Sequence, residues 1–187
     1  MWLSRALAII LLVINSAAYA GSISVDMTST AAQFEAGFGS EGGAEFQSGF
    51  FYNDQGSVLL NSGLVAKGGG DQDAASGLVV GGGVKALAGN IQQAGVTNSA
   101  FCIALGAQGA FTPPAMPLVT LVGEFFSSVK ITTFGDSDHF SQFALRLETG
   151  PPQAKFFIGY REITFSIIGV GDVAVDKGSY IGISFKF

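Results

Sequence analysis

Apolar residues are frequent in this chain, yet they never form a stretch long enough to cross a bilayer as a helix. The mean hydropathy is +0.45, and only 12% of the residues are charged. The longest uninterrupted apolar run extends from Ala6 to Ile14, whereas a transmembrane helix needs ~20 residues. The pattern excludes a helical membrane protein and intrinsic disorder, and it argues against a soluble enzyme of ordinary composition. Such a chain is typical of a transmembrane β-barrel.

The first segment of the chain, residues 1–20, has the features of a signal peptide. Arg5 supplies a positive charge, residues 6–14 form an apolar segment, and Ala18-Tyr19-Ala20 matches an A-x-A cleavage motif. The alternative is a short buried helix. We expect cleavage after Ala20, with Ala18 and Ala20 read by the peptidase, and export of residues 21–187 as a barrel.

The remaining chain consists of segments with period-2 alternation, separated by clusters of Gly, Pro, Asn and Asp. This arrangement predicts strands and turns. Ten segments fit: residues 23–27, 32–38, 44–52, 57–66, 77–87, 99–111, 118–127, 138–148, 154–164 and 178–187. The sequence therefore predicts an all-β, antiparallel up-and-down barrel of ten strands. An eight-strand alternative omits the first two segments.

Alternation gives each predicted strand one apolar face. Phe46, Phe50 and Tyr52 share a face, while Glu45 and Gln47 lie on the other. In water such faces would turn inward, as in a sandwich or a lipocalin-like barrel. The low charge content favours the reverse arrangement, in which lipid contacts the apolar face and polar and small residues line the lumen. The polar residues expected in the lumen include Glu45, Gln47, Lys85, Gln108, Glu124, Gln142, Arg146, Arg161 and Lys186.

The connections predict an orientation. All five prolines fall in residues 112–117 and 149–153, two short turns on the side of both termini. The longer connections 88–98, 128–137 and 165–177 lie on the opposite side, whereas the Gly-rich connection 67–76 breaks this pattern. Short periplasmic turns and longer external loops are typical of bacterial outer-membrane barrels.

The C-terminal segment carries an assembly motif. Tyr180, Gly182, Phe185 and Phe187 resemble the terminal strand that the barrel-assembly machinery reads, because an unpaired strand edge is open to β-augmentation. We therefore expect that machinery and periplasmic chaperones as partners, together with outer-membrane lipid and lipopolysaccharide.

Three groups of residues resemble the YfaZ family of outer-membrane proteins. They are Gly123-Glu124-Phe125-Phe126, Gly159-Tyr160-Arg161, and the final segment from Gly178 to Phe187. The resemblance implies an integral outer-membrane barrel of a Gram-negative bacterium. It implies no reaction, and the middle loops differ in length from the family's, so no ligand contacts are carried over.

The most distinctive cluster of polar residues is expected in the lumen. Aligning neighbouring strands across their turns places Glu124 level with about Gln142, and Arg161 level with about Ser141. We expect Glu124, Gln142 and Arg161 to form one layer. A second layer, nearer the periplasm, is formed by Arg146, Glu148 and Lys155. Opposite charges in a low-dielectric lumen should pair. These layers either fill and rigidify the barrel or form a charged constriction that selects solutes.

Two other clusters are weaker candidates for a catalytic or metal-binding site. Asp136, Ser137, Asp138 and His139 could form a catalytic base and its orienting acid at the barrel rim, or simply a polar loop. Asp71 and Asp73 in the Gly-rich connection lack most ligands of a calcium loop. Cys102 is the single cysteine, which excludes an intramolecular disulfide. Glu162 falls on the lipid-facing side, which is tolerable only at the outer rim.

These observations predict a monomeric outer-membrane barrel with a largely closed, polar lumen. Its role would be structural, in envelope integrity or surface interaction. A narrow passive pore is the alternative, and a rim enzyme is a further one. We expect no enzymatic activity, no cofactor and no metal. The acidic chain also lacks the basic runs that nucleic-acid binding needs.

Overall fold

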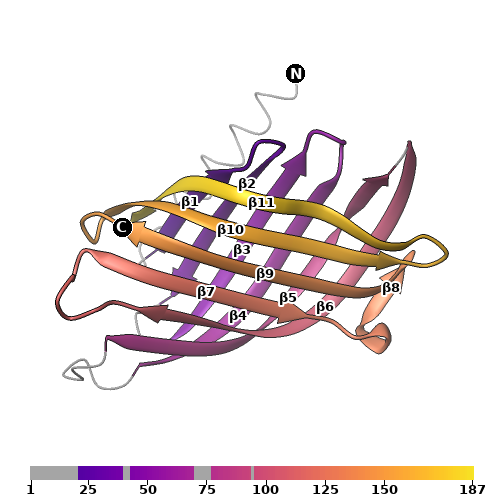
Figure 1. Ribbon diagram of the computed structural model, residues 1–187. Helices are drawn as coiled ribbons and strands as arrows, with labels where there is room; N and C mark the ends of the chain where they lie inside the picture. Colours follow the sequence, from indigo (N-terminus) through magenta and orange to yellow (C-terminus); the bar gives the residue numbers. More distant parts are fainter. Residues whose placement is uncertain (1–20, 40–42, 70–76, 94) are drawn as a thin grey trace.

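The chain folds into a closed antiparallel β-barrel (Figure 1). The computed structural model describes residues 21–39, 43–69, 77–93 and 95–187. The predicted signal peptide with Ala18 and Ala20, and the aspartates Asp71 and Asp73, lie outside the described residues. Within these ranges, no helix has the length and apolarity needed to cross a membrane.

The strands and their bounds are β1 (Gly21–Met27), β2 (Ala31–Gly39), β3 (Ala44–Asn53), β4 (Val58–Gly69), β5 (Leu78–Gln93), β6 (Val96–Phe111), β7 (Val119–Ser127), β8 (Thr133–Gly135), β9 (Ser137–Thr149), β10 (Ala154–Ile167) and β11 (Gly171–Lys186), with a 3-10 turn, η1 (Lys130–Thr132), between β7 and β8.

Ten of these eleven strands close the barrel. Each pairs with its neighbour in the chain, β7 pairs with β9, and β1 pairs with β11 to complete the ring. The additional strand, β8, pairs with β6 beyond the point where β7 has ended. The prediction of ten strands is confirmed, and the eight-strand alternative is wrong because β1 and β2 are full members of the sheet.

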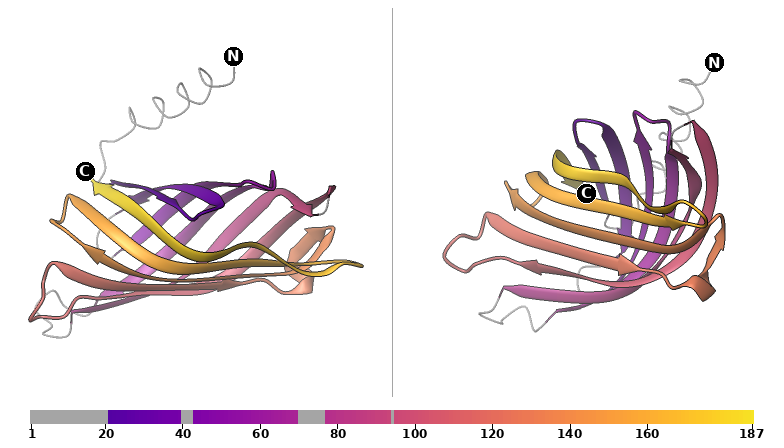
Figure 2. Two further views of the ribbon diagram at one scale, coloured as in Figure 1. Left: turned by 45° about the horizontal axis from the view of Figure 1, so that its top comes forward. Right: turned by 45° about the vertical axis from the view of Figure 1, so that its right-hand side comes forward.

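The two ends of the barrel differ. Gly21 and Phe187 exchange backbone hydrogen bonds of 2.8 and 3.0 Å, so both ends of the described barrel lie together. We call this the terminus end and the opposite one the loop end. The strands tilt strongly relative to the barrel axis. The β10–β11 turn and β8 extend at the loop end (Figure 2).

The outward face is apolar, as alternation predicted. The exposed outward side chains include Phe46, Phe50, Tyr52, Leu78, Val80, Val84, Phe101, Ile103, Leu105, Phe143, Leu145, Leu147, Phe156, Ile158, Ile181 and Phe185. A surface of this kind is unfavourable in water and favourable in hydrocarbon. Glu162 also points outward, but it is paired with Lys177 on the neighbouring strand, with Nζ and Oε1 3.0 Å apart.

Two segments predicted as loops are strands. Residues 88–93 and 96–98 belong to β5 and β6, and residues 165–167 and 171–177 belong to β10 and β11. The second error has a clear cause. A bulge opposite Ile163 and Thr164 leaves Val175 as an extra residue in β11, so Val175 and Asp176 are both buried. The bulge breaks the period-2 pattern, and alternation alone therefore indicates a loop there.

Candidate functional site

The polar interior begins near the terminus end with a charged cluster around Glu148. Its carboxylate accepts a hydrogen bond from Arg146 Nε at 2.8 Å and another from Lys155 Nζ at 3.1 Å. Lys155 Nζ also donates to Thr120 Oγ1 at 3.2 Å. The structure thus brings together the three residues of the predicted second layer. A neighbouring pair, Lys67 and Glu45, lies on β4 and β3.

A second cluster crosses the barrel deeper inside. Lys85 Nζ donates to Glu124 Oε1 at 2.8 Å, and Gln142 Nε2 donates to the same oxygen at 2.7 Å. Lys85 is 1% exposed, and its ammonium lies 4.4 Å from the centroid of the Phe126 ring. Because a charge buried alone is costly, these contacts explain how a lysine can occupy the interior.

Arg161 does not join that cluster, contrary to the predicted first layer. Its guanidinium pairs with Asp26 on β1 and Asp176 on β11, each at 2.8 Å, and donates to Gln33 on β2. The predicted positions along β9 are shifted by two and three residues, although Glu124 and Arg161 do lie level with each other. Glu124 lies opposite Ala144, as does Arg161 from the other side. Closure of the barrel brings β1 beside β11, and the turn-by-turn alignment of β7, β9 and β10 does not include that contact.

The loop-end half of the interior is mainly apolar, with buried polar side chains such as Asn53 and Ser57 near the turns, and the sequence reasoning missed this. Its largest buried side chains are Phe51, Ile91, Phe126, Phe140 and Phe165, all below 2% exposure. They belong to one cluster with Leu59, Leu87, Cys102, Ile163, Ile167, Val173 and Val175. We call this set the apolar core. The signal was present in the Phe50-Phe51 and Phe125-Phe126 doublets, because adjacent strand residues point to opposite faces.

Packing in the apolar core is direct. The rings of Phe140 on β9 and Phe165 on β10 have centroids 4.9 Å apart. Arg161 marks the boundary with the polar interior, since its guanidinium carbon lies 5.0 Å from the Tyr180 ring centroid and 5.7 Å from that of Phe51.

Water access falls along the barrel axis. The side chains of Lys67 and Arg146, toward the terminus end, are 28% and 27% exposed. Those of Lys85 and Arg161 are 1% and 3% exposed, and Phe140 in the apolar core has no exposure. The charged interior is therefore reached from the terminus end and stops at the apolar core.

The rim cluster does not assemble as a catalytic arrangement. Asp138 pairs with Lys130, Asp136 Oδ2 accepts from the Ser99 backbone at 2.8 Å, and His139 is exposed while Ser137 is buried. Among the residues that the structure describes, no group of three His, Cys, Asp or Glu side chains is placed to hold a metal ion.

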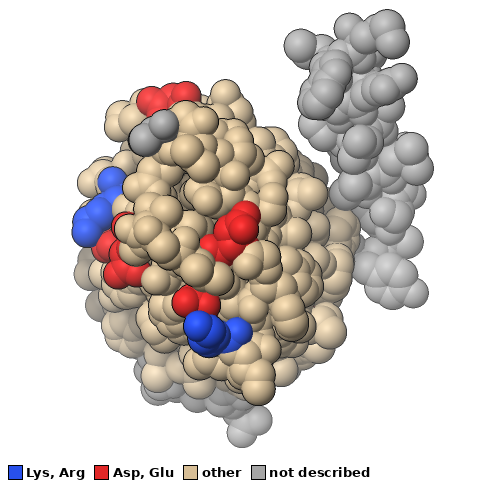
Figure 3. All heavy atoms as spheres, turned by 90° about the vertical axis from the view of Figure 1, so that its right-hand side faces the viewer, with Lys and Arg blue, Asp and Glu red and all other residues tan. Residues whose placement is uncertain are grey.

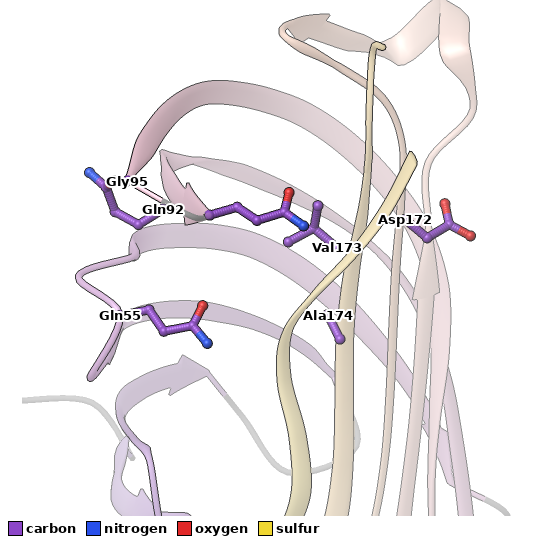
Figure 4. A pocket seen from close by; sticks show the side chains of 7 residues that line it. Gln55, Gln92, Gly95, Asp172, Val173 and Ala174 are labelled. Carbon is purple, nitrogen blue, oxygen red and sulfur yellow. The ribbon is translucent and has the colours of Figure 1, made fainter. Parts of the chain in front are cut away.

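The terminal strand presents its motif on two faces. Tyr180 is buried inside the barrel, and Gly182 lies inside as well, where an added Cβ would clash with the Phe157 ring. Phe185 and Phe187 are exposed. A pocket of about 480 Å³ lies at the loop end, lined by residues of three hairpins (Figure 4).

The pairing, the apolar exterior and the filled interior define an antiparallel up-and-down β-barrel. No protein-family model and no curated protein sequence matches the chain. Two solved structures resemble it. One is the outer membrane channel DcaP of Acinetobacter baumannii, with 10% identity, a TM-score of 0.44 and coverage of 88% of this chain. This chain spans 54% of that channel's length.

The second structure is described as "Unveiling the Mechanism Behind the in-meso Crystallization of Membrane Proteins". It has 12% identity and a TM-score of 0.41, and the match covers 90% of this chain and 83% of that one. The fold assignment rests on the strand pairing of this chain itself.

Proposed function

We propose that this protein is an integral outer-membrane barrel with a closed lumen, and that its role is structural or one of surface interaction. The observation that most directly supports a closed lumen is the apolar core. Its largest side chains are inaccessible to water and occupy the loop-end half of the interior. A general porin instead needs a wide aqueous channel, which 16–18 strands provide. The apolar outward face supports residence in a membrane.

We infer the orientation from the side on which the sheet extends. The terminus end faces the periplasm, and the opposite end, where the β10–β11 turn and β8 extend, faces outward. The resemblance to the YfaZ family, the signal peptide and the terminal aromatic motif support export and assembly in the outer membrane of a Gram-negative cell. Lipid and lipopolysaccharide surround the barrel, and the assembly machinery reads its last strand.

Location and orientation are tested by surface labelling. In a Cys102→Ala background, Val170→Cys, in the exposed β10–β11 turn at the loop end, should react with a membrane-impermeant maleimide on intact cells, and the barrel should sediment with outer membranes. Gln47→Cys, on the interior face near the terminus end, is the matched control and should react only after lysis. Soluble fractionation, or labelling of Gln47→Cys alone on intact cells, would contradict the proposal.

A further inference from the structure

The loop-end pocket is built from three hairpins that buried hydrogen bonds hold together. Asn53 Nδ2 on β3 donates to the Val175 carbonyl on β11 at 2.9 Å, although β1 and β2 lie between these strands. The Ser57 hydroxyl accepts from the Gln92 backbone at 3.0 Å. The tips of β3–β4, β5–β6 and β10–β11 are thus fixed relative to one another. A preorganised pocket binds a ligand at less entropic cost.

The pocket lining is rich in primary amides and has no basic side chain. Gln55, Gln92 and Gln93 line it together with Gly95, Asp172, Val173 and Ala174. Figure 4 shows Gln55 directed toward Ala174, whereas the Asp172 carboxylate turns away. Each amide both donates and accepts hydrogen bonds. Gln93 Oε1 is buried without a hydrogen-bond partner, so this amide gains from a ligand donor if it turns into the pocket.

The surroundings disfavour a charged ligand. The loop-end surface in Figure 3 is mostly uncharged, and its basic side chains lie beside acidic ones. Lys130 is paired with Asp138, and Lys177 with Glu162. An anion finds no basic partner in the lining. Beneath the pocket, buried Val173 belongs to the apolar core, so a ligand would stop here rather than pass through.

From this geometry we propose that the loop-end pocket binds a neutral, hydroxyl-rich ligand, a short saccharide. Hydroxyl groups donate and accept, as the glutamine amides do, and the pocket volume of about 480 Å³ falls within the ~300–1,000 Å³ typical of small-ligand sites. That the pocket faces the cell exterior rests on the proposed function. That the folded chain binds a saccharide there does not depend on it.

The test is saturation-transfer NMR on the folded full barrel in a detergent without a sugar headgroup, because maltoside detergents would compete. The probes are maltotriose and cellotriose, with glucose 6-phosphate and glucosamine as charged comparisons. We expect saturable binding of a neutral trisaccharide. Gln55→Ala and Gln93→Ala should each weaken it at least tenfold. Gln47→Ala, inside the terminus half, is the matched control and should leave it unchanged.

Two kinds of result would overturn the proposal. One is the absence of saturable binding by either trisaccharide, or stronger binding of a charged sugar. The other is equal affinity in Gln93→Ala and Gln47→Ala. Gln55 is an exposed turn residue, so its variant should keep the heat-modifiable mobility of the folded barrel. Because the measurement is made in detergent, its failure is distinguishable from a failure of the membrane orientation.

Discussion

At the residue scale, the buried ion pairs explain how charges persist inside a small barrel. Arg161 neutralises Asp26 and Asp176 while donating to Gln33, and it joins three consecutive strands of the ring, β10, β11 and β1, to β2. Removing one partner of a buried pair leaves an uncompensated charge, which costs more than the pair itself contributes.

Arg161→Met should therefore destabilise the barrel by about 3–5 kcal/mol, because two buried carboxylates lose their partner. Urea unfolding in lipid vesicles measures the change. Lys130→Met is the matched control, since it removes the exposed ion pair with Asp138 at the loop end and should alter stability little. Equal, small effects in the two variants would show that the interior pairs are not structural.

Whether a side chain points outward or into the barrel also differs from one residue to the next. Leu145 is exposed on the outward face and Ala144 is buried inside. Leu145→Lys should cost roughly 2–4 kcal/mol if the position lies near the bilayer midplane. In a Cys102→Ala background, Leu145→Cys should be shielded from water-soluble thiol reagents in the inserted barrel. Ready labelling there would reverse the assignment of inside and outside.

At the element scale, β11 has two tasks. It closes the ring by pairing with β1, and in the proposed role its edge is recognised by an assembly factor before closure. Changing Phe185 and Phe187 to Ala should lower the amount of folded barrel in the outer membrane, measured by fractionation and heat-modifiable mobility. Phe111→Ala is the control, because Phe111 is an outward aromatic at the same end of the barrel. Similar losses in both variants would remove any special role for the last strand.

The elements also show what the sequence could predict. Alternation located every strand of the ring and its apolar outward face, because one polar and one apolar face leave a period-2 signal. It failed at the Val175 bulge, where the phase changes, and at residues 88–98, whose polar composition resembles a loop. The predicted grouping of Glu148 with Arg146 and Lys155 succeeded because Arg146 is on the same strand as Glu148 and Lys155 follows across a short turn. Asp26 and Gln33, two partners of Arg161, come from across the closure, where the sequence gives no register, and Asp176 lies in the segment that was predicted as a loop.

At the scale of the whole molecule, the interior has two halves with different physical roles. The terminus half is charged and partly accessible, and the loop-end half is an apolar core. The sequence suggested closure by interlocking charges. The structure adds an apolar seal in which Phe140 and Phe165 pack at 4.9 Å between ring centroids. Ions do not cross such a segment unless it is wetted, because desolvating a charge in an apolar medium is costly.

Planar-bilayer recording on the purified barrel tests this account most directly. The wild-type protein should show no steady channel conductance, whereas the Phe140→Ala/Phe165→Ala variant should open ion-conducting events by removing both packed rings. Phe143→Ala, which truncates an outward side chain of the same strand, should remain closed. A large, steady wild-type conductance would contradict the closed lumen. Small, charge-selective wild-type currents abolished by Glu124→Gln would contradict it in favour of the narrow pore.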